Sequence, residues 1–478
     1  MSKRYQIRDP VHNFVELRDK EIKLVGTPVF QRLRGIRQLA MANLVYPGAL
    51  HTRFDHSLGV CHVAGLLSRQ LGLSDDETTL VRLAALLHDL GHGPFSHVSE
   101  NLLERYADRS KLADGQKKEK IHELVTAHLI QSDQDILRIL GEDTCREIVE
   151  LLSIGHGQPA LRSIVSGPLD SDKQDYLLRD SLFCGVEYGV FDIHQLHRSL
   201  VLHGADHEKE LMIDPDGIHA VEQYVLGKYY LTTNVYRHKV RLITDQMLVR
   251  AIVRGIDEDG IDELRAIYAF DDTQEFYNRY TKWNDAMLMS TFSGDSKPGT
   301  GCGRMFDRLQ SRRLLKRVFQ ERIQNFVGLD VRGTLLSSGG NPKDDQERKA
   351  GETLRKEIEG GLARILTEHF SRSGGDAVDR ADVVVNVFDI KSVRTTSRND
   401  EPGIMIATSG APVFFQDESA LFASINESYT EAFVEVYAPA PAAWSDRTQR
   451  AKWLKALNKP IRDAIESALK PVPKGKSS

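Results

Sequence analysis

Apolar residues recur at helical spacing from about residue 27 to about residue 185, so this part of the chain is predicted to be mainly α-helical. Thr27-Pro28 predicts one helix start, because threonine can cap a helix and proline fits its first turn. Ser74 and Glu77 form a capping-box pattern that predicts another. Residues 5–17 instead predict a short extended segment before the helices.

The pattern changes after residue 200. Residues 210–214 predict a strand that ends in an Asp-Pro-Asp-Gly turn. One long helix is expected from about 218 to 255, and the Gly/Ser/Pro-rich stretch 293–303 predicts a loop or boundary.

The last third of the chain alternates between helical and extended patterns. Strands rich in Val, Ile and Phe are expected at 383–390, 404–408 and 432–436. Helices are expected near 345–370, 417–426 and 446–469. We therefore predict a mainly α fold, with a helical domain over residues 1–300, a smaller α+β lobe over 301–470 and a disordered tail over 471–478.

Composition is that of an ordinary globular protein, with 41% hydrophobic and 27% charged residues in 478. The net charge of −5 gives no general reason to expect nucleic acid or an anionic membrane as the partner. The four cysteines are scattered without a CxxC pair, so neither disulfides nor a zinc finger is predicted. Without a signal-peptide or membrane-spanning pattern, the expected location is the cytoplasm.

Histidines gather beside an aspartate in the helical region. Six of the 17 histidines lie between residues 51 and 97, about a tenth of the chain. His88-Asp89 ends an apolar helix and is followed by His92 and His97 in a glycine-rich segment. Because imidazole and carboxylate groups are common metal ligands and proton carriers, this cluster predicts a metal or proton-transfer site.

Two further stretches could complete such a site. His56 begins a predicted helix just after Arg53, a residue suited to phosphate. Asp172 lies in a segment dense in carboxylates, although spacing alone would equally fit a solvated helix start.

The order His56, His88-Asp89, Asp172 resembles the signature of the HD superfamily of metal phosphohydrolases, in particular its deoxynucleoside triphosphate (dNTP) triphosphohydrolase branch. The similarity is to the HD half of the sterile-alpha-motif/HD-domain dNTPase, and no sterile-alpha-motif domain is expected here. The stretches that carry the resemblance, within residues 5–245, are Asp9–His12, Thr27–Arg34, Phe54–Gly59, Leu87–His97, Asp172–Asp180 and Tyr236–Lys239.

The resemblance implies that His56, His88, Asp89 and Asp172 hold a divalent metal. Two histidines with two aspartates suit Fe, Mn, Co, Ni or Zn, and Mg can join through the substrate phosphates.

The resemblance also implies the catalytic groups. His92, His97 and His122 line the phosphates, and His97 is expected to give the proton to the leaving group. Glu100 stands where the family usually has aspartate, in a position to orient His97.

Substrate contacts are implied in three groups. Arg53, Lys173 and Tyr176 are expected to contact phosphate or sugar, and Gln38 and Asp180 are expected to bind the 3′-hydroxyl. Leu39 and Tyr236 would crowd C2′ and reject a ribose hydroxyl. Without the resemblance, ordinary helix packing would also explain Gln38, Leu39 and Tyr236.

One departure concerns activation. The family's activator site uses an acidic residue just before the Thr-Pro pair, with an arginine nearby. Here that residue is Gly26, while Arg34 matches the arginine. Guanine-specific activation through the same contacts is therefore not expected, and another nucleotide activator or none stays open.

The expected function is metal-dependent hydrolysis of dNTPs to deoxynucleoside and inorganic triphosphate, by attack of a metal-bound hydroxide on the α-phosphorus. The family is oligomeric, so a dimer or tetramer is expected, and no membrane partner is. Two alternatives stay open: another HD-type phosphomonoesterase or phosphodiesterase acting on nucleotides, or a nucleotide-regulated nucleic-acid-binding protein. P-loop chemistry is excluded, because no GxxxxGK[ST] segment occurs.

Overall fold

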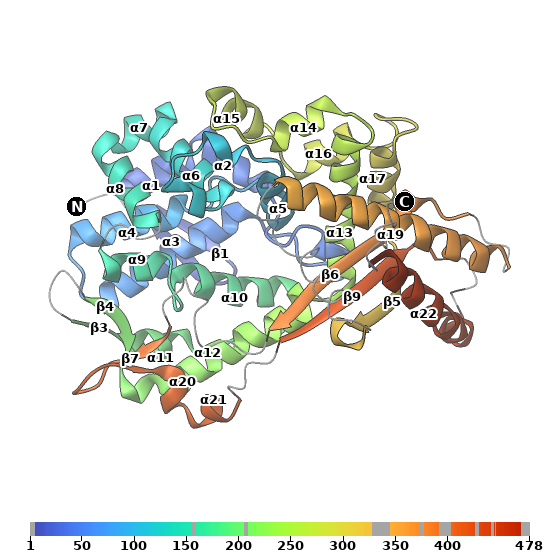
Figure 1. Ribbon diagram of the computed structural model, residues 1–478. Coiled ribbons are helices and arrows are strands. Elements are labelled where there is room, and N and C mark those ends of the chain that lie inside the picture. The colour runs from blue at the N-terminus through green and yellow to red at the C-terminus, as the bar shows by residue number, and fades with distance from the viewer. Residues whose placement is uncertain are drawn as a thin grey trace, which may run out of the picture. The chain divides into compact units, whose positions relative to one another are not determined.

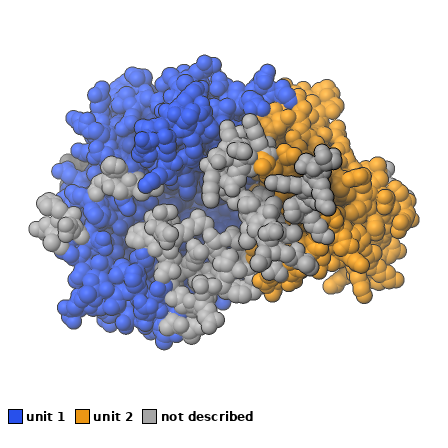
Figure 2. All heavy atoms as spheres, viewed as in Figure 1, with its two compact units in different colours: residues 1–242, 260–292, 393–426 blue, residues 243–259, 293–392, 427–478 orange. Residues whose placement is uncertain are grey.

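The computed structural model describes residues 5–153, 158–204, 209–326, 345–372, 377–391, 403–425, 430–440, 444 and 446–469. The chain forms two compact units, coloured separately in Figure 2: residues 1–242, 260–292 and 393–426 make unit 1, and residues 243–259, 293–392 and 427–478 make unit 2. The fold is mainly α-helical with small sheets, as predicted. The domain boundary expected at residue 300 stays a prediction, and the expected tail at 471–478 lies outside the described residues. No helix in the described ranges combines the length and apolar character needed to cross a membrane.

Unit 1 begins with an antiparallel hairpin of β1 (Tyr5–Asp9) and β2 (Asn13–Leu17), where an extended segment was predicted. Helices follow (Figure 1): α1 (Asp19–Val25), α2 (Pro28–Gln31), α3 (Arg53–Gln70), α4 (Asp75–Leu87), α5 (His97–Tyr106), α6 (Ile121–Ser132), α7 (Gln134–Leu140), α8 (Glu142–Leu152), α9 (Pro159–Val165), α10 (Ser171–Cys184), α11 (Ile193–Arg198), α12 (Ile218–Leu231), α14 (Asp262–Tyr268), α15 (Gln274–Tyr280), α16 (Asp285–Thr291), α20 (Phe415–Glu418) and α21 (Ala420–Ile425). Among them α3 is central, because it packs against both α4 and α10.

Local sequence explains where the central helices begin. The predicted capping box of α4 is present, with the Ser74 hydroxyl accepting from the Glu77 amide and the Glu77 carboxylate accepting from the Ser74 amide. A second capping box, of Thr52 and Asp55, begins α3. The helix predicted at Thr27-Pro28 is real but only four residues long, and a 3₁₀ turn continues it.

A small mixed sheet also belongs to unit 1. Its strand order is β3 (Leu200–His203), β4 (Glu210–Ile213), β7 (Met405–Ile406) and β8 (Val413–Phe414). The strands predicted at 210–214 and 404–408 therefore pair with each other, although nearly 200 residues separate them.

The single long helix predicted at 218–255 is wrong. The helix α12 ends at Leu231, a π-helical turn spans Thr232–Tyr236, and α13 runs from Lys239 to Asp257. The side-chain amide of Asn234 donates to the Tyr230 carbonyl oxygen, competing with the backbone of the helix. The break lets the Tyr236 hydroxyl reach Asp180, a distant contact that local periodicity cannot encode.

Unit 2 contains an antiparallel sheet of three strands in the order β5 (Lys316–Arg322), β9 (Thr430–Ala438) and β6 (Val384–Lys391). The helices α19 (Asp345–Ser371) and α22 (Arg447–Leu469) pack against each other and against this sheet, and α17 (Gly301–Gln310) precedes it. Alternate residues of β9, Val434 and Val436, are fully buried in the shared core. Helices and strands predicted near these positions are therefore confirmed.

Candidate metal centre

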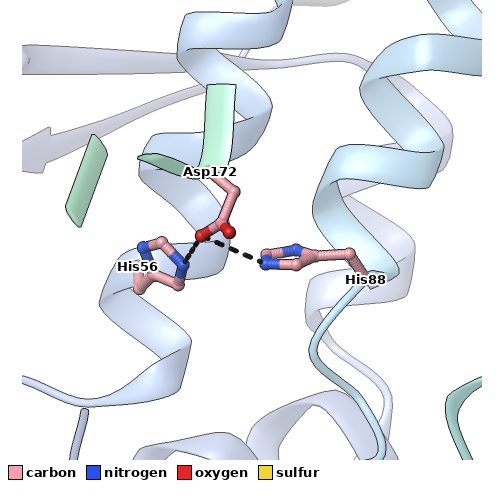
Figure 3. A group of neighbouring side chains, drawn as sticks. All are labelled: His56, His88 and Asp172. Carbon is pink, nitrogen blue, oxygen red and sulfur yellow. Dashed lines mark hydrogen bonds and ion pairs between the residues drawn. The ribbon is translucent and has the colours of Figure 1, made fainter. Parts of the chain in front are cut away.

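Three helix ends bring two histidines and an aspartate together. His56 lies in the first turn of α3, His88 follows the last residue of α4, and Asp172 lies in the first turn of α10. Figure 3 shows both imidazole rings pointing toward the Asp172 carboxylate. The His56 Nε2 atom lies 2.9 Å from Asp172 Oδ1, and the His88 Nε2 atom lies 3.9 Å from the same oxygen. One ligand atom from each residue lies within 4.8 Å of the other two, which is the spacing a single ion requires.

Asp89 lies beside this trio but is engaged elsewhere. Its Oδ1 atom is 3.2 Å from His88 Nε2, and its Oδ2 atom is 3.8 Å from His56 Nε2. The same carboxylate bonds Arg53 Nη1 at 2.8 Å and His92 Nε2 at 3.0 Å. Asp89 is therefore within reach as a fourth ligand, and that role stays a prediction.

A buried ionic network lies behind His56. The Asp175 carboxylate accepts from His56 Nδ1 at 2.8 Å and from His12 Nε2 at 2.6 Å. It also accepts two bonds from Arg179, whose Nη1 atom in turn bonds Asp9 at 2.9 Å. These charged partners hold the pKa of Asp175 well below its usual range despite its burial, so it is a permanent acceptor. The network fixes the orientation of the His56 ring.

Close approach makes glycine necessary within this network. A Cβ atom at Gly59, one turn after His56, would lie 1.9 Å from Asp175 Oδ1 and 2.3 Å from Arg179 Nη2. A side chain there would displace the Asp175 carboxylate and the Arg179 guanidinium and so disturb the network.

The hydrogen bonds fix the tautomers in a way that suits a cation. Since the ionised Asp175 can only accept, His56 Nδ1 carries a proton. The Nδ1 atom of His88 carries one too, because it faces the Ala85 carbonyl oxygen at 2.8 Å. In the neutral rings both Nε2 atoms then present lone pairs toward carboxylate oxygens, and the buried His88 Nε2 has no hydrogen-bond partner. A cation between these lone pairs resolves the mismatch, so the donor set fits a divalent transition metal.

A proton is the competitor for this position. Burial lowers the pKa of His56, but hydrogen bonds to Asp172 and Asp175 outweigh it and raise the pKa to about 10. Without a metal, His56 is therefore doubly protonated at neutral pH, and metal binding must release that proton.

A second group of polar side chains adjoins the first. The His97 Nδ1 atom lies 2.8 Å from Glu100 Oε1, and the His92 Nδ1 atom lies 3.3 Å from the same oxygen. The rings of His92 and His122 stack with centroids 4.7 Å apart. His92, Glu100 and His122 are also close enough to share an ion. The structure thus brings the four predicted catalytic residues together.

Their protonation states differ. Burial and the neighbouring His92 lower the pKa of His122 to about 3, so its ring is neutral at pH 7. Burial raises the pKa of Glu100, but its contact with His97 outweighs burial and leaves that carboxylate ionised. The His97 side chain is 61% exposed, so it can contact a ligand.

Two predicted phosphate contacts are held in place by acids. Arg53 donates to Asp89 and, through Nε, to Ser96 Oγ at 2.9 Å, while its buried Nη2 atom has no partner. Lys173 Nζ bonds Asp170 Oδ2 at 2.7 Å. Tyr176 lies 6.2 Å from the Tyr236 ring, measured between centroids, which joins it to the predicted sugar contacts.

Hydrogen bonds connect three of the predicted sugar contacts through His51: Asp180 bonds both Tyr236 and the His51 ring, and the Gln38 backbone amide donates to the His51 carbonyl oxygen at 3.1 Å. Asp180 accepts from Tyr236 and from His51 Nε2, the latter at 2.7 Å. Gln38 and Leu39 are both buried, and the Gln38 Oε1 atom has no hydrogen-bond partner. An unpaired buried acceptor suits a hydroxyl donor of a ligand.

Some residues of the site were not assigned a role from the sequence. The distant contacts of His12, Asp175 and Arg179 carry no local signal, although the four-residue spacing of Asp175 and Arg179 on α10 permits an ion pair. Ser96, which bonds Arg53, was also missed.

Comparison with known proteins shows what the chain is similar to. The family model of the HD domain matches residues 53–173, and that of the HD associated region matches residues 191–334. An uncharacterized protein of Bacillus subtilis, YwfO, is 34% identical over 264 residues, which are 53% of this chain and 57% of that protein. The human deoxynucleoside triphosphate triphosphohydrolase SAMHD1 is 29% identical over 359 residues, which are 67% of this chain and 54% of that protein.

The chain thus spans little more than half the length of these curated relatives. Among solved structures, a hypothetical protein of Aquifex aeolicus superposes with a TM-score of 0.66 at 26% identity, covering 95% of this chain and 100% of the other. Both the HD core and the rest of the fold therefore have counterparts.

Proposed function

This chain belongs to the HD superfamily, and on that premise we propose that it hydrolyses dNTPs to deoxynucleoside and inorganic triphosphate. The observation that carries the proposal is the convergence of His56, His88 and Asp172 from three helices, with both Nε2 lone pairs facing one carboxylate. The activity named for the human relative supports the choice of dNTPs as substrates. A divalent transition metal bound here would supply a water nucleophile at neutral pH and withdraw charge from the attacked phosphate.

The chain's own cations would hold the triphosphate. The unpartnered Nη2 atom of Arg53 is an available donor, and Lys173 stands one residue after Asp172. The neutral ring of His122 adds an N–H donor without adding charge. Such fixed donors stabilise the charge that develops on phosphate oxygens as the bond to the leaving group breaks.

Proton transfer falls to His97. Its Nδ1 atom bonds the Glu100 carboxylate, so Nε2 is turned outward and can give a proton to the leaving 5′-oxygen. Glutamate in place of the family's aspartate still reaches the ring, at 2.8 Å.

The sugar would be selected by shape and by one hydrogen bond. Gln38 Oε1 is a free acceptor for the 3′-hydroxyl. The packed ring of Tyr236, fixed through its hydroxyl to Asp180, would stand with Leu39 against C2′. A ribose hydroxyl there would be buried without a partner, which disfavours ribonucleotides.

The direct test is product analysis. The purified protein is incubated with each dNTP and each ribonucleotide, with Fe, Mn, Co, Ni or Zn in turn, and with or without a second nucleotide as activator. We expect deoxynucleoside and inorganic triphosphate, and no turnover by His88→Ala. Release of pyrophosphate or orthophosphate would favour another HD-type hydrolase. Salt-sensitive retention of nucleic acid without nucleotide turnover would favour a binding protein.

A further inference from the structure

One buried carboxylate outside the metal centre accepts hydrogen bonds from two distant backbone segments. Asp285, the first residue of α16, is 7% exposed. The Phe95 amide donates to its Oδ1 atom at 2.7 Å, and the Arg37 amide donates to its Oδ2 atom at 3.1 Å. Each oxygen of the carboxylate therefore holds one segment.

Both segments carry residues of the candidate site. Phe95 lies between His92 and His97, and Arg37 directly precedes Gln38. Among the described residues, the Asp285 carboxylate bonds these two backbone amides and none of the predicted metal ligands, so it belongs to the support of the site.

The segment around Phe95 needs such support. Phe95 and Ser96 have φ values of 60° and 50°, in the left-handed region that residues with side chains rarely adopt. The helix α5 begins with His97 directly after them. The Ser96 hydroxyl also donates to the Arg37 carbonyl oxygen at 2.8 Å, so the two segments are tied to each other as well as to Asp285.

Burying an ionised carboxylate at this position costs free energy. Burial raises the pKa of Asp285 to about 6, even though the two amides and the nearby Arg37 and Arg32 favour its ionised form. A neutral amide of the same size offers only one acceptor oxygen, so the carboxylate is what allows both backbone amides to be bound.

From this geometry we propose that Asp285 is a positioning residue, which fixes the His92–His97 segment and the Gln38 segment relative to each other. The proposal rests on the proposed function, because it gives those segments their catalytic and substrate-binding roles. Asp285 acts through His97, whose place at the start of α5 depends on the backbone turn that the carboxylate fixes.

The variant Asp285→Asn tests this with little change in size. An amide can accept at one atom only, and its NH₂ group would face a backbone N–H donor. We expect kcat for dNTP hydrolysis to fall about 10- to 100-fold, with the metal content unchanged. In a His97→Ala background the same substitution should cause little further loss, because residues that act as a unit are not additive.

Asp259→Asn is the matched control. The Asp259 carboxylate also accepts two backbone amides, those of Gly301 and Cys302, but these lie in unit 2 and carry no site residue. Two results would overturn the positioning role. The first is a fall in kcat in Asp285→Asn no larger than that in Asp259→Asn. The second is a fall in the double variant equal to the product of the falls in Asp285→Asn and His97→Ala.

Hydrogen exchange separates failure of this proposal from failure of the proposed function. Peptides that contain Phe95 and Arg37 should exchange faster in Asp285→Asn than in the wild type, whatever the substrate is. If the wild type hydrolyses no dNTP, the proposed function fails while this readout still tests the hydrogen bonds. If the wild type is active and Asp285→Asn changes neither exchange nor kcat, the positioning role is wrong.

Discussion

Replacing Asp175 by asparagine should weaken metal binding, although none of the predicted metal ligands is changed. The Asp175 carboxylate is fully buried and accepts four hydrogen bonds, from His12, His56 and twice from Arg179, at 2.6–2.9 Å. Asparagine keeps the shape but turns one acceptor into a donor that faces other donors. The His56 ring then loses the partner that fixes its proton on Nδ1 and its lone pair on Nε2.

Two magnitudes follow. Loss of an outer partner of a metal-bound histidine typically costs 10- to 100-fold in metal affinity, which is about 1.4–2.8 kcal/mol. Breaking a buried ion pair costs about 3–5 kcal/mol of folding stability, and here we expect the lower end because Arg179 keeps Asp9 as a partner. The lowered pKa of Asp175 means that its contribution is complete above the unfolded-state pKa and is lost only as pH falls through the folded-state value. Measurements at neutral pH therefore report the full difference in the free energy of unfolding between the wild type and Asp175→Asn.

Glu21→Gln is the matched control. Glu21 is 1% exposed and forms a two-bond ion pair with Arg82, as Asp175 does with Arg179, but it contacts no residue of the site. Metal affinity by competition with a chelator, and stability by denaturant titration of the metal-free protein, are measured for both variants. We expect both to lose stability and only Asp175→Asn to lose metal affinity. Equal metal affinities would refute a role for the Asp175 network in tuning the metal centre.

Three further results are expected. His97→Ala should retain the metal, measured by elemental analysis, while kcat falls about 10²- to 10⁴-fold; parallel loss of metal would contradict its assignment as proton donor. Metal binding at pH 7–8 should release about one proton, because the pKa of His56 without metal is raised to about 10, and affinity should rise with pH until that value. Calorimetry in buffers of different ionisation heat measures this release, and its absence would exclude His56 as a ligand. In the wild type we expect kcat/KM for a dNTP to exceed that for the matching ribonucleotide by about 10²-fold, and Tyr236→Ala should lower this ratio. An unchanged ratio would show that the ring does not face C2′.

Local patterns were sufficient for most of the fold. The Ser74 and Glu77 pair predicted the start of α4, and runs of Val and Phe predicted β6 and β9. They failed at 232–236, where the helix breaks to let Tyr236 reach Asp180. That contact joins residues 56 positions apart, so no local spacing reveals it.

The site shows the same division. The excess of histidines beside Asp89 predicted a site from composition alone, because few other functions gather imidazoles next to a carboxylate. Asp172 came only from the resemblance, since a charged helix start is commonplace. The sequence could not predict the supporting roles of Asp175 and Asp285, because each bonds residues more than 100 positions away.

The most direct test of the central claim is hydrolysis of a dNTP in ¹⁸O-labelled water with the metal-loaded protein, followed by mass spectrometry of the products. Attack of water on the α-phosphorus predicts one ¹⁸O atom in inorganic triphosphate and none in the deoxynucleoside. Label in pyrophosphate, orthophosphate or the nucleoside would contradict it, because the water would then have attacked a different atom.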